Sequence, residues 1–416
     1  MKRHITLMLS LLAISAVFAA TPLDNFLKSK SISSGSTAVL VQDLQTGETL
    51  AAHNTDRPLL PASIMKTVTI AGLLQEKGPY ERFHTYVYAD GPIKGNVIEG
   101  NLMIVGGGDP TLGANCAPES ADIAEEIIAS LRHRGITAIT GDIRVDTSLY
   151  CGPSCPPSWA AGDLNEAYGT GCHALNFRRN ASGSRAVRNP ESVFLSYIAS
   201  RLRSAGISIS GTTGTVHTGD TGTDRCTELL DHVSDTYAEV MRSCMMRSDN
   251  LFAETLLRTF ALARGKEGST EAGASEMLEY WKGAGIPTKG VTLIDGSGLS
   301  RSNRVTASFI NGILQAMGDN EEYASFMPLA GQEGTLSGFL KDTDLDAYVA
   351  MKTGSMKGIQ CYAGYKLDEE FAPTHSIVII MNDIGPRTSA RKAAEDLLLG
   401  IFGGAVFDTT GAADDI

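Results

Sequence analysis

The apolar segment from Pro61 to Gly78, PASIMKTVTIAGLLQEKG, constrains the fold more than any other part of the sequence. Isoleucine, methionine, valine and leucine recur along it at helical spacing, and Gly78 followed by Pro79 ends the pattern. A helix with so much apolar surface must be buried inside a domain. Ser63 lies at its start and Lys66 one turn later, so the two side chains share one face.

A serine beside a buried lysine has a specific chemical use. A serine hydroxyl is a weak nucleophile unless a base takes its proton. A lysine can be that base only where burial or a second cation lowers its pKa. The apolar helix around Lys66 supplies the burial, and the helix N-terminus near Ser63 would stabilise a developing oxyanion. Because Ser-x-x-Lys also occurs by chance in many chains, an ordinary surface lysine is the alternative at this point.

Two further tripeptides follow in order along the chain. Ser248-Asp249-Asn250 precedes a second apolar helical segment at residues 250–264, and Lys352-Thr353-Gly354 ends a strand-like run. The order Ser-x-x-Lys, then Ser-x-Asn, then Lys-Thr-Gly is the signature set of penicillin-recognising serine enzymes. Each motif also lies on the expected local element, a condition that chance matches seldom meet together.

With these motifs the chain resembles the low-molecular-mass class C penicillin-binding proteins, which are D-alanyl-D-alanine carboxypeptidases and endopeptidases. The resemblance covers nearly the whole mature chain, and the family carries a large insertion between its first two motifs. The 185 positions between the two serines (248 − 63 = 185) fit that layout, although the insertion is shorter than in the longest members. Four more blocks resemble family segments: NLMIVGGGDPTL at 101–112, RSDNLFAETLLR at 247–258, DGSGLSRSNRVTA at 295–307 and LAGQEGTL at 329–336.

The resemblance implies a role for each catalytic position. Ser63 would be the acylated nucleophile and Lys66 the proton acceptor. Ser248 would relay a proton to the nitrogen of the leaving D-alanine, and Asn250 would hold a substrate carbonyl. Lys352 would pair with the terminal carboxylate, and its charge should help to keep Lys66 neutral, because like charges depress a lysine pKa.

The resemblance also implies which residues bind the substrate. Thr353, Gly354 and Ser355 would line the strand that docks the peptide, and the backbone amides of Ser63 and Ser355 would form the oxyanion hole. A side-chain pocket would be built from Trp159, Asp163, Tyr168, Leu299, Arg301 and Met356.

In this pocket Asp163 would bind the free ammonium of a diamino acid such as diaminopimelate. The alternative for Trp159 and Tyr168 is a place in the core of the insertion. Asp295 and Arg301 could equally form a structural salt bridge.

The fold that follows is α+β: a penicillin-binding/β-lactamase-like transpeptidase domain, an antiparallel sheet flanked by helices, with a large inserted strand-rich domain. Residues 20–85 and 235–405 would form the peptidase domain from both ends of the chain, and residues 406–416 a tail. We expect strands at 37–43, 48–53, 348–353, 360–367 and 376–382, and helices from Ser63 to 77 and at 250–264, 270–282 and 392–402.

The inserted segment, residues 86–234, is rich in glycine, proline, serine and threonine and shows no internal repeat. We expect it to have its own core, as one or two subdomains. Short strand-like runs occur at 101–107 and 138–146 and in a piece ending near Thr223, and helical patterns occur at 122–133 and 191–204.

The first nineteen residues read as a secretory signal. A basic start, MKRH, precedes an apolar run that ends at Phe18, and small side chains at Val17 and Ala19 suit a signal-peptidase site. A short membrane anchor is the alternative, although the run is short for a span. We therefore expect a periplasmic or extracellular protein without a transmembrane segment after signal removal.

The net charge and the cysteine content limit which ligands and partners this chain is expected to bind. The formal net charge is −12, and removing Lys2 and Arg3 gives 33 − 47 = −14 for the mature chain, which argues against nucleic acid and anionic lipid. The eight histidines form no triad pattern, and seven cysteines leave at least one unpaired. The spacing of Cys151, Cys155 and Cys172 fits no standard metal site, so we expect structural thiols or disulfides, no metal and no cofactor.

The predicted function is that of a serine DD-peptidase with peptidoglycan stem peptides as substrates and β-lactam antibiotics as covalent inhibitors. A β-lactamase is a second interpretation, but it needs fast deacylation, and no E-x-x-L-N segment lies between Asn250 and Lys352. Class C β-lactamases carry tyrosine where this chain has Ser248. A non-catalytic cell-wall-binding protein is a third, although every catalytic position is intact.

Overall fold

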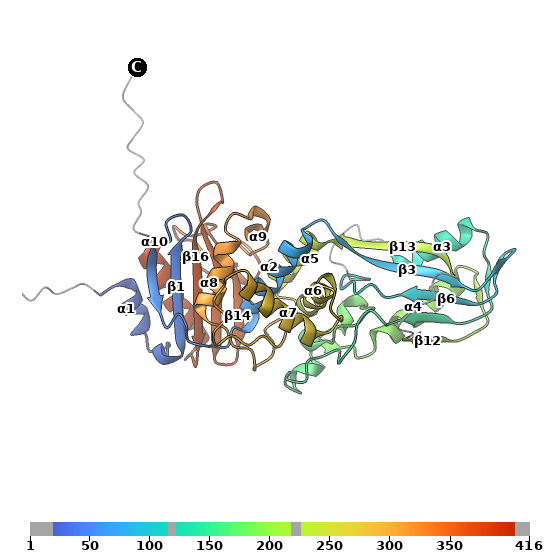
Figure 1. The fold of residues 1–416 in the computed structure, drawn as a ribbon, viewed down its shortest axis with the longest axis horizontal. Coiled ribbons are helices and arrows are strands. Elements are labelled where there is room, and N and C mark those ends of the chain that lie inside the picture. Colours follow the sequence, from blue (N-terminus) through green and yellow to red (C-terminus); the bar gives the residue numbers. More distant parts are fainter. Residues whose placement is uncertain (1–19, 115–121, 218–225, 404–416) are drawn as a thin grey trace, which may run out of the picture.

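A five-stranded antiparallel sheet forms the centre of one end of the molecule (Figure 1). The computed structural model describes residues 20–114, 122–217 and 226–403. The strand order β14-β15-β16-β1-β2 joins the two ends of the chain, because β1 pairs with β16 in antiparallel register. The strands are β1 (Thr37–Asp43), β2 (Thr49–His53), β14 (Val349–Met356), β15 (Ile359–Leu367) and β16 (Pro373–Asn382).

The sheet is buried on both faces, and its side chains alternate between two cores. In β1, Ala38 and Leu40 join the larger core under the main helical layer, whereas Val39 and Val41 join the core under the terminal helices. The terminal helices are α1 (Pro22–Leu27) and α10 (Arg387–Phe402). The opposite layer contains α2 (Met65–Lys77), α5 (Tyr237–Arg247), α6 (Asn250–Ala263), α7 (Thr270–Gly283), α8 (Ala307–Ala316) and α9 (Glu321–Ser325).

The insertion extends away from this sheet and has its own core (Figure 1). It leaves along β3 (Arg82–Asp90) and returns along β13 (Thr227–Thr236), and these two strands pair with each other. Its sheets have the orders β12-β8-β6-β3-β13 and β11-β7-β5-β4, beside a β9–β10 hairpin. The remaining elements are β4 (Ile93–Lys94), β5 (Val97–Ile98), β6 (Asn101–Val105), α3 (Ile123–His133), β7 (Ala138–Ile139), β8 (Ile143–Asp146), β9 (Ala181–Ser182), β10 (Arg185–Ala186), α4 (Pro190–Ser204), β11 (Ser208–Ile209) and β12 (Thr213–Val216).

Short 3₁₀ turns connect several of these elements, and all of them except η1 contribute residues to the site described below. The turns are η1 (Ser34–Ser36), η2 (Ala62–Ile64), η3 (Asp163–Asn165), η4 (Ala167–Gly169), η5 (Arg178–Asn180) and η7 (Gly334–Leu336).

The predicted antiparallel sheet flanked by helices is confirmed, with three differences in detail. The strand-like run at 138–146 is two strands, β7 and β8, which belong to different sheets. Helix α10 begins at Arg387, five residues before the predicted start, and among the elements that were not predicted are α1, α5, α8, α9 and the long strand β3. The predicted signal at 1–19, the end of the strand-rich piece near Thr223 and the tail at 406–416 lie outside the described residues. None of the described helices is long and apolar enough to cross a bilayer.

Candidate active site

Ser63 and Lys66 lie at the junction of η2 and α2. Lys66 Nζ is 3.1 Å from Ser63 Oγ and also donates hydrogen bonds to Asn250 Oδ1 at 2.7 Å and to the Ser297 carbonyl at 2.8 Å. The lysine side chain is fully buried, because α2 packs against α6 in the larger core. Ala62, directly before the serine, has φ 47°, a conformation that costs a non-glycine residue energy and recurs at functional sites.

Burial lowers the pKa of Lys66 from its ordinary value of 10.5. Nearby Cys244, Asp295, Asp249 and Glu254 oppose this effect by favouring the charged amine. A lowered pKa enlarges the fraction of neutral amine, and only the neutral amine can accept the proton of Ser63 Oγ. The environment of Lys66 is therefore that of a base.

Lys352 shows a different balance. Its side chain is fully buried in β14, and Nζ donates to the Thr353 carbonyl at 2.7 Å. Burial, and then repulsion from the Lys66 charge, hold the pKa of Lys352 well below 10.5. Burial is the largest cause for both lysines, and the repulsion between their charges disfavours the state in which both are protonated.

Ser248 connects α5 to α6 as the C-terminal cap of α5. Its φ of 56° is left-handed, which is uncommon for serine and turns the chain sharply between the helices. Asp249 then caps α6, because its carboxylate accepts the backbone N–H of Phe252 at 3.2 Å. The turn thus presents Ser248 and Asn250 on the side that faces Lys66.

A cavity of about 310 Å³ collects the three motifs. Ser63, Ser248, Thr353 and Ser355 all line it. Strand β14 is the edge strand of the sheet; the first half of its outer edge pairs with residues 328–330, which leaves the segment from Thr353 onward as the part that an extended peptide could approach. The other lining residues are Thr335, Leu336, Phe339, Gln360, Tyr362, Arg387 and Arg391.

Gly354 is the point at which β14 touches the nucleophile turn. A Cβ at this position would lie 2.7 Å from the Pro61 carbonyl oxygen and 3.0 Å from the Ser63 nitrogen. Both neighbours are backbone, so neither can swing away. A side chain at 354 would therefore push β14 and the Ser63 turn apart.

We expect Gly354→Ala to slow acylation of Ser63 by about 100-fold, because a displacement of that size removes the reacting atoms from their attack geometry. The overpacking should also destabilise the fold by about 1–3 kcal/mol. The measurements are the rate of fluorescent penicillin labelling and thermal unfolding. Gly214→Ala is the matched control, since it lies in strand β12 with nothing within 4 Å of the added Cβ. Unchanged labelling of Gly354→Ala would contradict the contact.

The insertion holds the Ser248–Asn250 motif from the other side. Asn250 Nδ2 donates to the Tyr168 carbonyl at 2.8 Å, and Arg179 forms an ion pair with the buried carboxylate of Asp249, with Nε at 2.8 Å from Oδ2. Tyr168 and Asn250 line a second cavity, of about 470 Å³, which shares Ser248 with the first. In this structure both ends of the Asn250 amide are engaged, by Lys66 and Tyr168.

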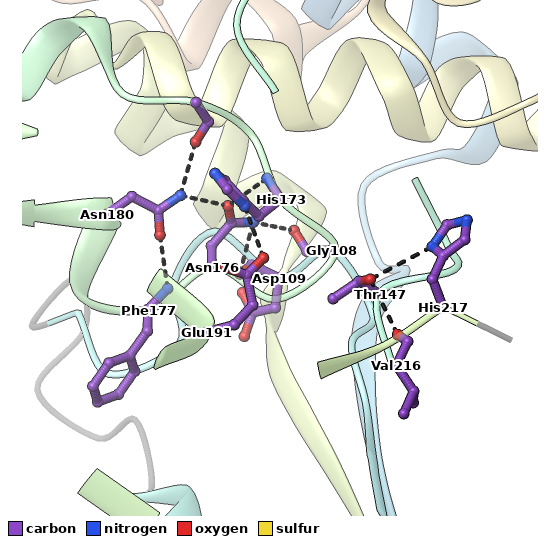
Figure 2. Close-up of polar contacts among 11 residues, drawn as sticks. Gly108, Asp109, Thr147, His173, Asn176, Phe177, Asn180, Glu191, Val216 and His217 are labelled. Atoms are coloured by element: carbon purple, nitrogen blue, oxygen red, sulfur yellow. Dashed lines mark hydrogen bonds and ion pairs between the residues drawn. The ribbon is translucent and has the colours of Figure 1, made fainter. Parts of the chain in front are cut away.

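A strained turn aims Arg179 at this motif. Arg178, Arg179 and Asn180 all have positive φ, between 50° and 56°. Figure 2 shows what holds the turn: Asn180 Nδ2 donates to Asn176 Oδ1 and to the Gly171 carbonyl, each at 2.8 Å, and Asn180 Oδ1 accepts the Phe177 N–H at 2.9 Å. Such a run persists only where surrounding contacts enforce it.

We expect Arg179→Gln to lower kcat of the proposed peptidase about 10-fold, because Asp249 would lose its partner and the motif would be held less firmly. The free energy of unfolding should fall by about 1 kcal/mol, a small value because the arginine is half exposed. Steady-state kinetics and urea unfolding measure the two effects. Arg185→Gln, which breaks the exposed pair with Glu166, is the control. Equal effects of the two variants would show that Arg179 does not position the motif.

The residues predicted for the side-chain pocket fall into two groups. Asp163 and Tyr168 meet, since the tyrosine hydroxyl donates to Asp163 Oδ1 at 2.9 Å, and Tyr168 is 51% exposed. Trp159 is 5% exposed, and its indole N–H donates at 2.8 Å to Asp295 Oδ2 of the peptidase domain, so the side chain is buried against that domain and is not part of the insertion core. Leu299 and Met356 are half-buried and Arg301 is exposed.

The suggested Asp295–Arg301 salt bridge is wrong. Among the described residues the Asp295 carboxylate accepts the backbone N–H groups of Gly298 and Ser300 and the side chains of Asn303 and Trp159. It therefore shapes the loop whose Ser297 carbonyl binds Lys66. Glu254 supports the same loop by accepting the N–H groups of residues 296 and 297, and burial raises its pKa.

Cys151, Cys155, Cys172, Cys244 and Cys361 are free thiols in this structure, and no group of three metal-ligating side chains occurs among the residues it describes. The disulfide alternative thus receives no support from these five.

A serine beside a buried lysine amine, in the wall of a cavity that an edge strand also lines, on an α+β fold with this insertion, is the arrangement of a serine acyl-transfer enzyme of the penicillin-binding class. The chain belongs to the D-Ala-D-Ala carboxypeptidase 3 (S13) family, whose model matches residues 19–183 and 178–398. The resemblance inferred from the motifs is thereby confirmed.

Similar proteins cover most of this chain. It is 29% identical over 362 residues to carboxypeptidase DacB of Mycolicibacterium smegmatis, covering 83% of this chain and 76% of that one. It is 26% identical over 438 residues to a D-alanyl-D-alanine carboxypeptidase of Actinomadura, with coverage of 86% and 80%. The crystal structure of penicillin-binding protein 4 from Haemophilus influenzae has the same fold, with a TM-score of 0.80 at 21% identity, covering 92% of this chain and 98% of that one.

Proposed function

We propose that this protein is an exported serine DD-peptidase that removes the last residue of D-Ala-D-Ala peptides in peptidoglycan. One observation carries the proposal: a fully buried Lys66 amine lies 3.1 Å from the Ser63 hydroxyl, which lines one cavity with Ser248 and the edge strand β14. Family membership and carboxypeptidase relatives support the same reaction.

The first half of the reaction forms an acyl-enzyme. Ser63 Oγ attacks the carbonyl carbon of the penultimate D-alanine while its proton passes to Lys66 Nζ. The backbone N–H groups of Ser63 and Ser355 hold the oxyanion. Collapse breaks the C–N bond while Ser248 donates its hydroxyl proton to the departing nitrogen and receives in turn the proton held by Lys66 Nζ. When the peptide binds, before this attack, Asn250 exchanges one of its present partners for a substrate carbonyl.

The second half releases the shortened peptide. Water attacks the ester carbonyl, Lys66 accepts one proton of the water, and the Ser63 hydroxyl is restored. A cross-bridge is cleaved by the same steps when the leaving nitrogen belongs to a second stem. A β-lactam acylates Ser63 as its ring opens. Its leaving nitrogen stays covalently attached to the acyl group through the rest of the molecule.

The exposed Asp163–Tyr168 pair lies on the insertion near Asn250. We infer that Asp163 binds the ammonium of the diamino acid in the stem peptide, with Leu299, Arg301 and Met356 beside it. Such a substrate lies outside the cytoplasmic membrane, in keeping with the predicted signal at residues 1–19.

Digestion of purified muropeptides, with products identified by mass, tests the proposal. Loss of one alanine from pentapeptide monomers is the expected result, and conversion of dimers to monomers would add endopeptidase activity. Enzyme treated beforehand with penicillin is the control, because only Ser63 chemistry should be blocked. Intact pentapeptides after incubation with untreated enzyme would refute the proposal.

A further inference from the structure

Two arginines face the active-site serine across the 310 Å³ cavity. Arg387 and Arg391 of α10 line it together with Ser63 and Thr353. No carboxylate belongs to the described residues that line this cavity, so its charge is positive. Two fixed cations without an acidic partner in the cavity wall suit an anionic group of a ligand.

The arginines are held in place by their own helix. They lie four residues apart in the first turns of α10 and therefore on one face, and the helix N-terminus adds partial positive charge. Arg391 Nε donates to Glu395 at 3.1 Å, and its guanidinium lies over the Phe339 ring at 5.8 Å. Arg387 Nη2 makes a long contact of 3.4 Å with the Met356 carbonyl. The remaining guanidinium N–H groups can serve a ligand.

The position of Ser248 indicates which ligand group reaches these arginines. In the proposed reaction Ser248 protonates the leaving nitrogen, and the terminal carboxylate of the substrate is attached to the very next carbon. This carboxylate must therefore enter a cavity that Ser248 lines. Of the two such cavities described, the one beside the insertion lacks Ser63, and its charged lining residues have both signs, since the carboxylates of Glu166 and Asp249 lie among Arg178, Arg179 and Arg247. The 310 Å³ cavity contains Ser63, at which the scissile bond must lie, and its only charged lining residues among those described are the two arginines, so it suits the carboxylate better.

Lys352, the residue expected to bind this carboxylate, is poorly placed to do so. It is fully buried, does not line the cavity, and donates to its own strand at the Thr353 carbonyl. Thr353 and Ser355, in contrast, present hydroxyl groups on the cavity side, where each now bonds to a polar neighbour. A carboxylate between these hydroxyls and the arginines would be bound from both sides.

We propose that Arg387 and Arg391 bind the carboxylate of the leaving residue and make the enzyme selective for a free carboxyl group beside the scissile bond. This inference rests on the proposed function and adds to it a preference for substrates with a free carboxyl group at this position. The same preference applies to cross-bridges. A cross-linked peptide should be a poor substrate when the carboxyl group next to its leaving nitrogen is amidated.

The test compares two peptides, one ending in D-Ala-D-Ala and one in its C-terminal amide. Arg387→Gln and Arg391→Gln should each lower kcat/KM for the acid about 10- to 100-fold, as expected for a lost hydrogen-bonded ion pair. The weak turnover of the amide should be unchanged, which shows that the variants are folded and catalytically competent. Lys392→Gln, on the same helix and paired with Asp396, should affect neither peptide.

Two results would overturn the proposal. Equal losses with acid and amide would assign the arginines a structural role. A loss confined to the acid in Arg247→Gln, which alters the cavity beside the insertion, together with wild-type behaviour of Arg387→Gln and Arg391→Gln, would place the carboxylate on the other side of Ser248. Failure of the proposed function looks different, because the wild-type enzyme would then cleave neither peptide.

Discussion

Replacement of Ser63 by alanine is expected to lower kcat for D-Ala-D-Ala peptides by about 10⁶-fold and to abolish the covalent adduct with penicillin. The hydroxyl 3.1 Å from Lys66 Nζ is the atom to be acylated, and no other group in the proposed mechanism can replace it. Intact-protein mass spectrometry after incubation with penicillin reads the adduct, and release of D-alanine reads the turnover.

The matched control for this substitution is Ser196→Ala, in α4 of the insertion, whose hydroxyl donates to the Ser192 carbonyl of its own helix. It should keep full labelling and full turnover. A stoichiometric adduct on the Ser63→Ala protein would mean that the nucleophile lies elsewhere. Loss of the adduct with retained cleavage of muropeptides would separate penicillin binding from the peptidase reaction.

The sequence predicts the reacting side chains of this site better than the contacts that hold them in position. Helical spacing alone places Ser63 and Lys66 on one face, and the order of motifs brings Ser248, Asn250 and Lys352 to them. The carbonyl of Ser297 could not be predicted as a ligand of Lys66, because every residue has a carbonyl and only the packing of its loop selects this one.

The contact between Arg179 and Asp249 was missed for a related reason. Seventy positions separate the two residues, and the contact depends on a left-handed turn that no glycine marks. Helix α5, by contrast, carries a readable signal, since Thr236 and Glu239 form a capping box before its first turn. The early start of α10 at Arg387 lacks a capping side chain, and this start is what brings Arg387 to the active-site cavity.

Replacement of Lys66 by methionine is expected to slow acylation of Ser63 by about 10³- to 10⁴-fold, the usual contribution of a general base. Methionine keeps much of the buried volume but cannot accept the serine proton. Stopped-flow labelling with a fluorescent penicillin gives the rate constant. Lys77→Met, exposed in the last turn of the same helix, is the control and should label at the wild-type rate. A wild-type rate for Lys66→Met would assign the proton to another base.

The pH dependence of the same reaction tests whether the Lys66 amine is neutral or protonated, which the Lys66→Met substitution does not. Burial lowers the pKa of Lys66 below 10.5, so acylation should rise as pH increases through that lowered value and level off before pH 10.5. Because the charges of Lys66 and Lys352 repel each other, the pH profile of acylation reports the titration of the two lysines together. If the profile disappears in Lys66→Met, the observed titration depends on Lys66. The free energy of unfolding should also increase with pH. In the unfolded chain Lys66 keeps its proton up to about pH 10.5, so the increase should occur between the lowered pKa of the folded protein and that value. A rate that rises only near pH 10.5 would mean that Lys66 is an ordinary charged lysine, unable to activate Ser63 at neutral pH.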